Sequence, residues 1–202
     1  MWRASQAGCY FAAVIDMRVR PRVTRFLEPI GTALAALGMT PAVMTFLGLS
    51  VVIAGAVVIA NGELALGGAI MLGGSLLDGL DGAVARASDS VSAQGAFLDA
   101  AFDRLGEIAG FAGLAVAMVG DARILLLIIL SLGGAILVPY MRARAEAEGF
   151  DGRSGLMGRA ERVLLFSAGL IFGLVEPMLW VFVVLVWLTA FTRFWNTYRS
   201  LA

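Results

Sequence analysis

The chain has 202 residues, of which 60% are hydrophobic and 15% are charged, and its formal net charge at pH 7 is zero. Because a soluble domain is typically about half apolar, this composition favours an integral membrane protein over a soluble one. The single cysteine, Cys9, excludes an intramolecular disulfide, and the absence of histidine leaves acid–base chemistry to carboxylates, tyrosines or this cysteine. We expect no nucleic-acid partner.

Residues 1–38 are predicted to form a separate segment at the membrane surface. Four arginines between residues 18 and 25 make it basic, and apolar residues follow at helical spacing, namely Phe26, Ile30, Leu34 and Leu37. This pattern predicts an interfacial amphipathic helix that lies on an anionic leaflet. For roughly the first fifteen residues, the alternative is a poorly ordered terminus.

Residues 39–202 are predicted to form one all-α membrane domain with six transmembrane helices. Thr40 and Pro41 are typical of a helix N-cap and first turn, and the uncharged run from residue 41 to 60 has the length of about twenty residues that a span requires. Polar or glycine-containing turns separate the other expected helices, at residues 64–85, 93–119, 124–147, 159–175 and 178–198. We expect Pro139 to kink the fourth of them.

The arginines predict the orientation of these helices in the cell membrane. With six spans, the N-terminal segment and the regions after helices two, four and six share one side. That side holds all the arginines except Arg123, with Arg104 slightly inside the third helix. By the positive-inside rule this side is cytoplasmic. The end of the second helix and the start of the third are therefore expected to face the cytoplasm.

Four aspartates lie at these two helix ends, although carboxylates in membrane helices are costly and usually mark a functional site. Asp78 and Asp81 are three residues apart, and Asp99 and Asp103 are four apart, so each pair is expected on one face of its helix. An antiparallel hairpin would bring the two pairs to a similar depth. Four mutually repelling carboxylates suit hard divalent cations, and we expect two Mg²⁺ or Mn²⁺ ions.

Small and basic residues beside the aspartates favour a phosphate-containing ligand. Gly82 leaves room for a ligand against the helix backbone, Arg86 can reach a diphosphate one turn later, and Gly95 clears space beside the second pair. Two alternatives remain for the acids. An aspartate could form a structural ion pair with Arg86 or Arg104, or the acids could belong to an ion-coupled transporter.

The pattern Asp78-x2-Asp81-Gly82-x2-Ala85-Arg86-x8-Gly95-x3-Asp99-x3-Asp103 resembles the signature of the CDP-alcohol phosphotransferase family. The resemblance extends from about residue 25 to the C-terminus. It implies a homodimer that transfers a phosphatidyl group from CDP-diacylglycerol to an alcohol and releases CMP. A donor with archaeal isoprenoid-ether tails is equally compatible with the sequence.

The same resemblance implies roles for individual residues. Asp78, Asp81 and Asp99 would bind metal, and Asp103 would be both a metal ligand and the base that takes the proton of the acceptor hydroxyl. The residues that would contact the CDP part of the donor are Ala42, Val43, Met44, Thr45, Gly82, Arg86 and Ser92.

Residues 140–146 and 158–162 are similar to the prokaryotic phosphatidylinositol-phosphate synthases, which implies inositol 1-phosphate as the acceptor. Two positions depart from that pattern, with arginine at 142 where lysine is common and alanine at 160 where proline is common. The arginines that would bind the acceptor phosphate are Arg142, Arg144, Arg159, Arg162 and Arg193. Their alternative role is contact with lipid headgroups. A phosphatidylglycerophosphate synthase that uses glycerol 3-phosphate is the main alternative function.

Overall fold

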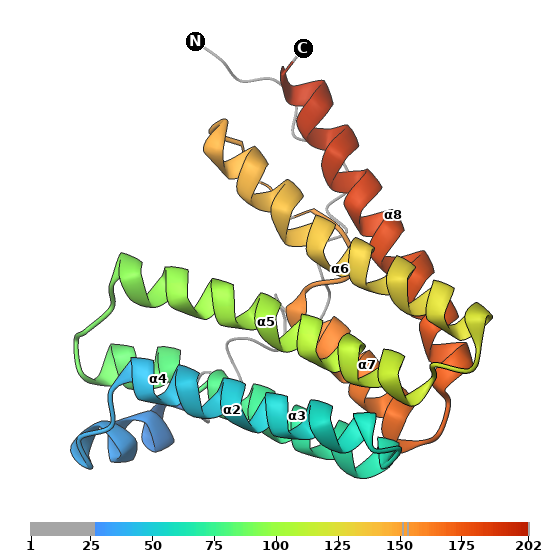
Figure 1. Cartoon of the computed structure of the whole chain (residues 1–202). Helices are drawn as coiled ribbons and strands as arrows, with labels where there is room; N and C mark the ends of the chain where they lie inside the picture. The colour runs from blue at the N-terminus through green and yellow to red at the C-terminus, as the bar shows by residue number, and fades with distance from the viewer. Residues whose placement is uncertain (1–26, 151, 153, 202) are drawn as a thin grey trace.

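The computed structural model describes residues 27–150, 152 and 154–201, and every regular element within these residues is an α-helix (Figure 1). Residues 27–36 are helical. The elements that follow are α2 (Pro41–Ala60), α3 (Leu64–Asp78), α4 (Asp81–Ala87), α5 (Ala93–Ala117), α6 (Ala122–Ala147), α7 (Arg159–Ile171) and α8 (Val175–Leu201). The prediction of an all-α protein is confirmed for the described residues.

Three helices begin at side chains that accept hydrogen bonds from the first turn. Thr40 Oγ1 accepts from the Val43 amide at 3.3 Å and Pro41 follows it, as the sequence predicts for α2. Ser92 caps α5 in the same way, and Asp121 caps α6. Each cap satisfies an amide that the helix itself leaves without a partner.

Four helical stretches are long and apolar enough to cross a bilayer, namely Pro41–Ala60, Leu64–Ala87, Ala122–Ala147 and Val175–Leu201. They are typical of a membrane protein that crosses the bilayer several times. α5 has 25 residues but carries four charged side chains between residues 99 and 107. α7 has 13 residues and is therefore roughly 20 Å long, shorter than a hydrocarbon core of about 30 Å.

α7 ends four residues before the position expected from its apolar run. Gly173 adopts a left-handed conformation with φ of 69°, which a glycine reaches at little cost. Its amide donates to the Leu170 carbonyl at 3.2 Å, and the Leu174 amide donates to the Gly169 carbonyl at 2.8 Å. This pair of bonds is a Schellman motif, which stops the helix although the following residues are apolar.

The second predicted helix, over residues 64–85, is divided in the structure. α3 ends at Asp78 and α4 begins at Asp81, with Gly79 and Leu80 between them. The Leu80 amide donates to the Leu77 carbonyl at 3.0 Å, three residues back, so the chain is wound more tightly there than in an α-helix. Gly79, a weak helix former, lies at the break. The two aspartates therefore lie on either side of a break rather than on one uninterrupted helix.

α2 and α3 approach each other closely because glycines line their contact. A Cβ added to Gly67 would lie 2.7 Å from the Gly55 carbonyl oxygen, and one added to Gly48 would lie 2.7 Å from Asp78 Cβ. Small residues are typical of closely packed helices in membranes. This contact seats the backbone of Asp78 directly against α2.

The main core joins α5, α7 and α8 through three phenylalanines. The rings of Phe111 and Phe166 are 4.8 Å apart between centroids, and those of Phe111 and Phe182 are 5.3 Å apart, both edge to face. α6 continues through Pro139 and lies alongside α8, and the C-terminal ends of both helices project beyond the rest of the bundle (Figure 1).

The helix of residues 27–36 packs on α2 and α4. Its apolar residues surround a small cluster of Met44, Leu80 and Val84, whereas Ile30 and Leu37 are exposed. Phe26 and the basic residues 18–25 lie outside the described residues. The location of this helix at a membrane surface stays a prediction.

Candidate metal and phosphate site

Three of the four predicted metal ligands meet at the junction of α3 and α5. Carboxylate oxygens of Asp78, Asp99 and Asp103 all lie within 4.8 Å of one another. Asp99 and Asp103 are one turn apart on α5, so helical spacing alone brings them together. Asp78 joins them from the end of α3. The arrangement concentrates negative charge at a partly buried point.

Asp81 belongs to a different network. Its Oδ2 accepts a hydrogen bond from Thr45 Oγ1 at 3.0 Å, and its Oδ1 accepts one from the amide of Gly82. The break at Gly79 separates its helix from that of Asp78. As a result, the expectation of four clustered carboxylates holds for three residues, and Asp81 is tied to the first turn of α2.

Arg159 supplies the positive charge at the cluster. Its guanidinium Nη2 pairs with both Asp78 and Asp103, and Asp103 is also 3.3 Å from Arg104 Nη2. Arg159 is the first residue of α7, whereas its two partners belong to α3 and α5. One expected phosphate ligand therefore lies directly beside the expected metal ligands.

Arg162, one turn after Arg159, is 3% exposed and has two partners inside the protein. Its Nε donates to Glu107 Oε1 at 2.6 Å, and its Nη1 donates to the Met157 carbonyl at 3.2 Å. Glu107 also lies 3.3 Å from Arg104 Nε. Sequence analysis missed Glu107, although its position one turn beyond Asp103 on α5 was a signal that could have identified it.

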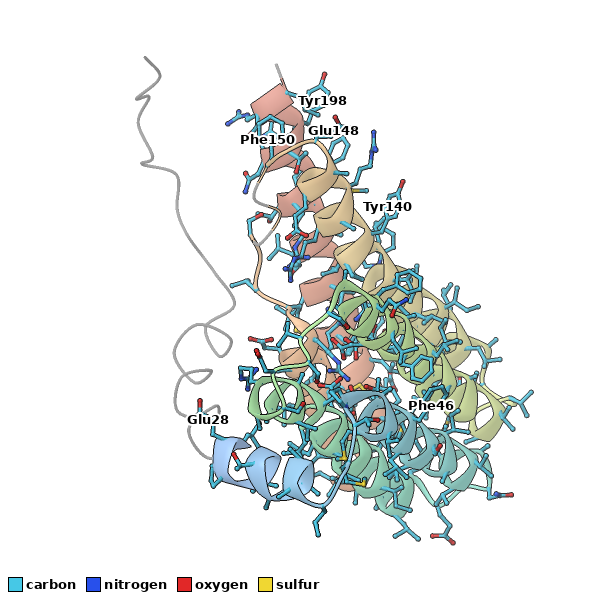
Figure 2. The ribbon with its side chains drawn as sticks, turned by 90° about the vertical axis from the view of Figure 1, so that its left-hand side faces the viewer. Glu28, Phe46, Tyr140, Glu148, Phe150 and Tyr198 are labelled. Carbon is cyan, nitrogen blue, oxygen red and sulfur yellow. The ribbon has the colours of Figure 1, made fainter. Side chains whose placement is uncertain are left out.

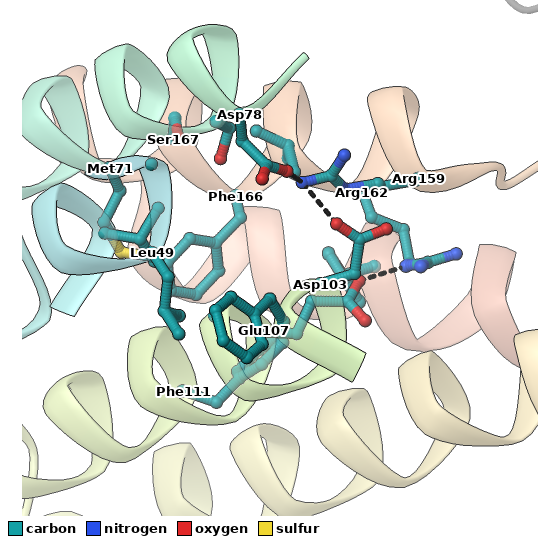
Figure 3. Close-up of a pocket in the computed structure, with 17 residues that line it drawn as sticks. Leu49, Met71, Asp78, Asp103, Glu107, Phe111, Arg159, Arg162, Phe166 and Ser167 are labelled. Carbon is teal, nitrogen blue, oxygen red and sulfur yellow. Dashed lines mark hydrogen bonds and ion pairs between the residues drawn. The ribbon is translucent and has the colours of Figure 1, made fainter. Parts of the chain in front are cut away.

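One side of a cavity of about 50 Å³ is lined by charged residues, namely Asp78, Asp103, Glu107, Arg159 and Arg162 (Figure 3). Figure 3 shows Asp78, Asp103 and Glu107 directed toward the guanidinium groups of Arg159 and Arg162. The opposite side is apolar and is formed by Leu49, Val52, Met71, Phe111, Phe166 and Phe182. Two guanidinium groups on the charged wall suit a phosphate.

The carboxylates fit a hard divalent cation. All the available ligand atoms are oxygens, the type that Mg²⁺ and Mn²⁺ prefer. Asp78 Oδ1 is buried and has no hydrogen-bond partner among the described residues, so one buried acceptor remains available to an ion. The described residues can thus hold a metal at Asp78, Asp99 and Asp103.

The residues expected to contact the CDP group lie on three neighbouring elements. Of the four in the first turn of α2, Ala42 and Val43 are exposed, Met44 packs on α4, and Thr45 holds Asp81. A Cβ on Gly82 would lie 3.4 Å from Arg86 Nη1, so the two α4 residues are adjacent. Ser92 is exposed at the start of α5 and caps it through its hydroxyl oxygen.

Three of the five expected acceptor arginines do not line this cavity. Arg142 pairs with Glu146 at 2.8 Å, and Arg144 pairs with Glu148, each along the exposed side of α6. Glu148 lies on the projecting end of that helix (Figure 2). Arg193 is buried but donates to the carbonyls of Ser154 and Val138 at 2.7 and 2.8 Å. Its guanidinium is thus used by the protein backbone.

Residues 38–195 match the family model described as CDP-alcohol phosphatidyltransferase. Archaetidylinositol phosphate synthase from Pyrococcus horikoshii is 32% identical over 187 residues, which cover 91% of this chain and 97% of the relative. Phosphatidylinositol phosphate synthase from Mycolicibacterium smegmatis is 32% identical over 182 residues, which cover 87% of this chain and 82% of the relative.

Solved structures of phosphatidylinositol phosphate synthase from Mycobacterium tuberculosis have a similar fold. The structure with CDP-DAG bound has a TM-score of 0.80 at 29% sequence identity and covers 86% of this chain and 94% of its own. The complex with manganese and citrate has a TM-score of 0.79 at 30% identity, with coverage of 85% and 88%.

Proposed function

The chain belongs to the CDP-alcohol phosphatidyltransferase family, and we propose that it transfers a phosphatidyl group from CDP-diacylglycerol, or from an isoprenoid-ether analogue, to inositol 1-phosphate. The products are phosphatidylinositol phosphate, or its ether-lipid equivalent, and CMP. One observation carries this proposal: Asp78 and Asp103, two of the three clustered carboxylates, share a cavity wall with the half-buried Arg159 and the buried Arg162. Carboxylates suit metal and proton transfer, and arginines suit a phosphorylated acceptor.

We propose that Asp78, Asp81, Asp99 and Asp103 hold two Mg²⁺ or Mn²⁺ ions. The manganese complex of the Mycobacterium tuberculosis synthase supports a divalent metal in this chain, and the three clustered carboxylates supply a place for it. When bound, the ions supply charge neutralisation for the diphosphate of the donor and for the departing CMP. Asp81 would contribute from the Thr45 side of the site.

The residues of the chain then position two substrates for an in-line transfer. Arg159 and Arg162 bind the phosphate of the acceptor, and Asp103 accepts the proton of its attacking hydroxyl. That oxygen forms a bond to the phosphorus that carries the lipid, and the bond from this phosphorus to the bridging oxygen of CMP breaks. CMP leaves with the electron pair. The residues proposed to hold the CDP part are Ala42, Val43, Met44, Thr45, Gly82, Arg86 and Ser92.

We also propose six membrane spans, with α5 and the short α7 added to the four apolar stretches. The charged side chains of α5 that line the cavity are turned away from lipid, which supports a membrane position for this helix. The excess of arginines at this end of the bundle supports a site at the cytoplasmic face. The helix of residues 27–36 would lie at that interface, and the protein would act as a homodimer.

The test is CMP release by the purified protein with CDP-diacylglycerol, Mg²⁺ or Mn²⁺, and one of four acceptors. We expect release with inositol 1-phosphate and little with glycerol 3-phosphate, inositol or serine. Preference for glycerol 3-phosphate would instead identify a phosphatidylglycerophosphate synthase. Ion flux in liposomes without CMP release from any acceptor would refute the enzyme in favour of a transporter. A second series with a CDP-activated isoprenoid-ether lipid identifies the donor class.

A further inference from the structure

Residues 154–158 lead directly into Arg159 and form a partly buried stretch of irregular backbone. Gly155 and Met157 are buried, and no side chain of the segment caps α7. Buried amides and carbonyls outside a helix need partners from elsewhere in the protein, because water cannot reach them. The position of this backbone therefore depends on the side chains that satisfy it.

Thr189 of α8 satisfies two successive amides of the segment. Its Oγ1 accepts hydrogen bonds from the amides of Leu156 at 3.2 Å and Met157 at 3.1 Å. The same hydroxyl donates to the Leu185 carbonyl at 2.8 Å, so both lone pairs and the proton are used. The side chain is 1% exposed, so no water can replace it.

Two further contacts fix the carbonyls and the path of the same segment. Arg193 Nε donates to the Ser154 carbonyl at 2.7 Å, and Arg162 Nη1 donates to the Met157 carbonyl at 3.2 Å. Gly155 has φ of 116°, and a Cβ there would collide with the Thr189 methyl group. The segment therefore passes against Thr189 in a conformation that L side chains rarely adopt.

We propose that Thr189 is a positioning residue for the acceptor site: its hydroxyl holds residues 154–158 against α8 and so sets where Arg159 presents its guanidinium. This inference rests on the proposed function of Arg159 as a ligand of the acceptor phosphate. It also gives Arg193 a use that differs from phosphate binding, since its donors hold the same segment and the adjacent part of α6.

The test compares Thr189→Val, which keeps the shape and removes the hydroxyl, with Thr189→Ser, which keeps the hydroxyl. Thr192→Val is the matched control, because the Thr192 hydroxyl only donates to the Leu188 carbonyl within α8. We expect Thr189→Val to raise the KM for inositol 1-phosphate about tenfold, as expected when buried amides lose their acceptor, with the KM for the CDP-lipid unchanged. Thr189→Ser and Thr192→Val should stay close to wild type.

Amide hydrogen exchange supplies a readout that does not require catalysis. Thr189→Val should accelerate exchange at Leu156 and Met157 but not in α2 or α3. Faster exchange there with an unchanged acceptor KM would refute the positioning role. An acceptor KM in Thr189→Ser as high as in Thr189→Val would refute the role of the hydroxyl, because only packing would remain as the cause.

The two proposals fail in different ways. If the wild-type protein uses no phosphorylated acceptor, the proposed function is wrong, whereas the exchange experiment still reports whether Thr189 holds the segment. If Thr189→Val does not fold in detergent, Thr189→Ala takes its place, since it removes the hydroxyl and adds no bulk. Equal KM values for Thr189→Ala and Thr189→Ser would then overturn the inference.

Discussion

The carboxylates and the arginines of the cavity are brought to it by different means. Asp99 and Asp103 meet because they are one turn apart on one helix, and Asp78 joins them through a tight contact between neighbouring helices. Arg159 and Arg162 are instead held by groups that lie between 5 and 81 residues away in the sequence. Local spacing predicts a shared face only within an unbroken helix, as for Asp99 and Asp103 but not for Asp78 and Asp81. The role of an arginine is decided by the partners that packing brings to it.

Among the carboxylates and arginines of the cavity, we expect the largest loss of activity from Asp103→Asn. The amide cannot accept the acceptor proton and is a poorer metal ligand, so CMP release should fall at least about a thousandfold. Asp121→Asn is the matched control, because it makes the same change at an exposed helix cap outside the cavity. Turnover near wild type in Asp103→Asn would contradict the assignment of the base.

Glu107→Gln tests whether a carboxylate of the cavity also stabilises the protein by pairing with Arg162. Arg162 is buried and would lose its anionic partner, and breaking such a pair costs about 3 kcal/mol of unfolding free energy. Glu146→Gln breaks an exposed pair on α6 and should cost under about 0.5 kcal/mol. Denaturant unfolding in mixed micelles measures the unfolding free energy of both variants. Equal losses in the two variants would show that the buried pair stabilises the protein no more than the exposed one.

Arg159→Ala tests the arginine that pairs with the clustered aspartates and that we propose as a ligand of the acceptor phosphate. The loss of a guanidinium that binds a phosphate should raise the KM for inositol 1-phosphate about 30-fold, the equivalent of roughly 2 kcal/mol for a charged hydrogen bond. The KM for the CDP-lipid should change less. Arg199→Ala removes an arginine that stacks on Trp195 at the far end of α8 and serves as the control. A larger change for the donor than for the acceptor would reverse the assignment.

The smallest effect is expected from Arg144→Ala. Its guanidinium is exposed and pairs with Glu148 along α6, away from the residues that line the cavity. We expect less than a twofold change in the acceptor KM, since exposed ion pairs contribute little. A rise comparable with that of Arg159→Ala would show that arginines of the projecting α6 end also bind the acceptor.

Most helix positions and the carboxylate cluster could be predicted because their signals are local. Thr40, Pro41 and the run to Ala60 define α2 with no reference to other elements. Two local signals were underestimated, however. Gly79 lies at the division of the second predicted helix, between two aspartates, and Gly173 ends α7 within an apolar run. A glycine in an apolar run is compatible with either continuation or termination, and hydrogen bonds decide between them.

The partners of the polar side chains could not be predicted in the same way. Asp81 is bonded to Thr45, which is 36 residues earlier, and Arg193 is bonded to Ser154, which is 39 residues earlier. Neither pairing follows from a helical period. Arginines at one end of a membrane domain look alike in sequence, and only packing separates Arg159 at the cavity from Arg144 on the surface.

The hydrogen bonds between Thr189 and residues 154–158 have a consequence for the order in which the protein folds during its own synthesis. The three clustered aspartates are complete once α5 has been made, whereas the segment before Arg159 gains the partners of the Leu156 and Met157 amides and of the Ser154 carbonyl from α8, the last helix in the described chain. Because chains fold as they emerge from the ribosome, the proposed metal ligands are assembled first and the segment that carries the proposed acceptor ligand last. If Arg159 binds the acceptor as proposed, a nascent chain would gain this acceptor site only after α8 has been made.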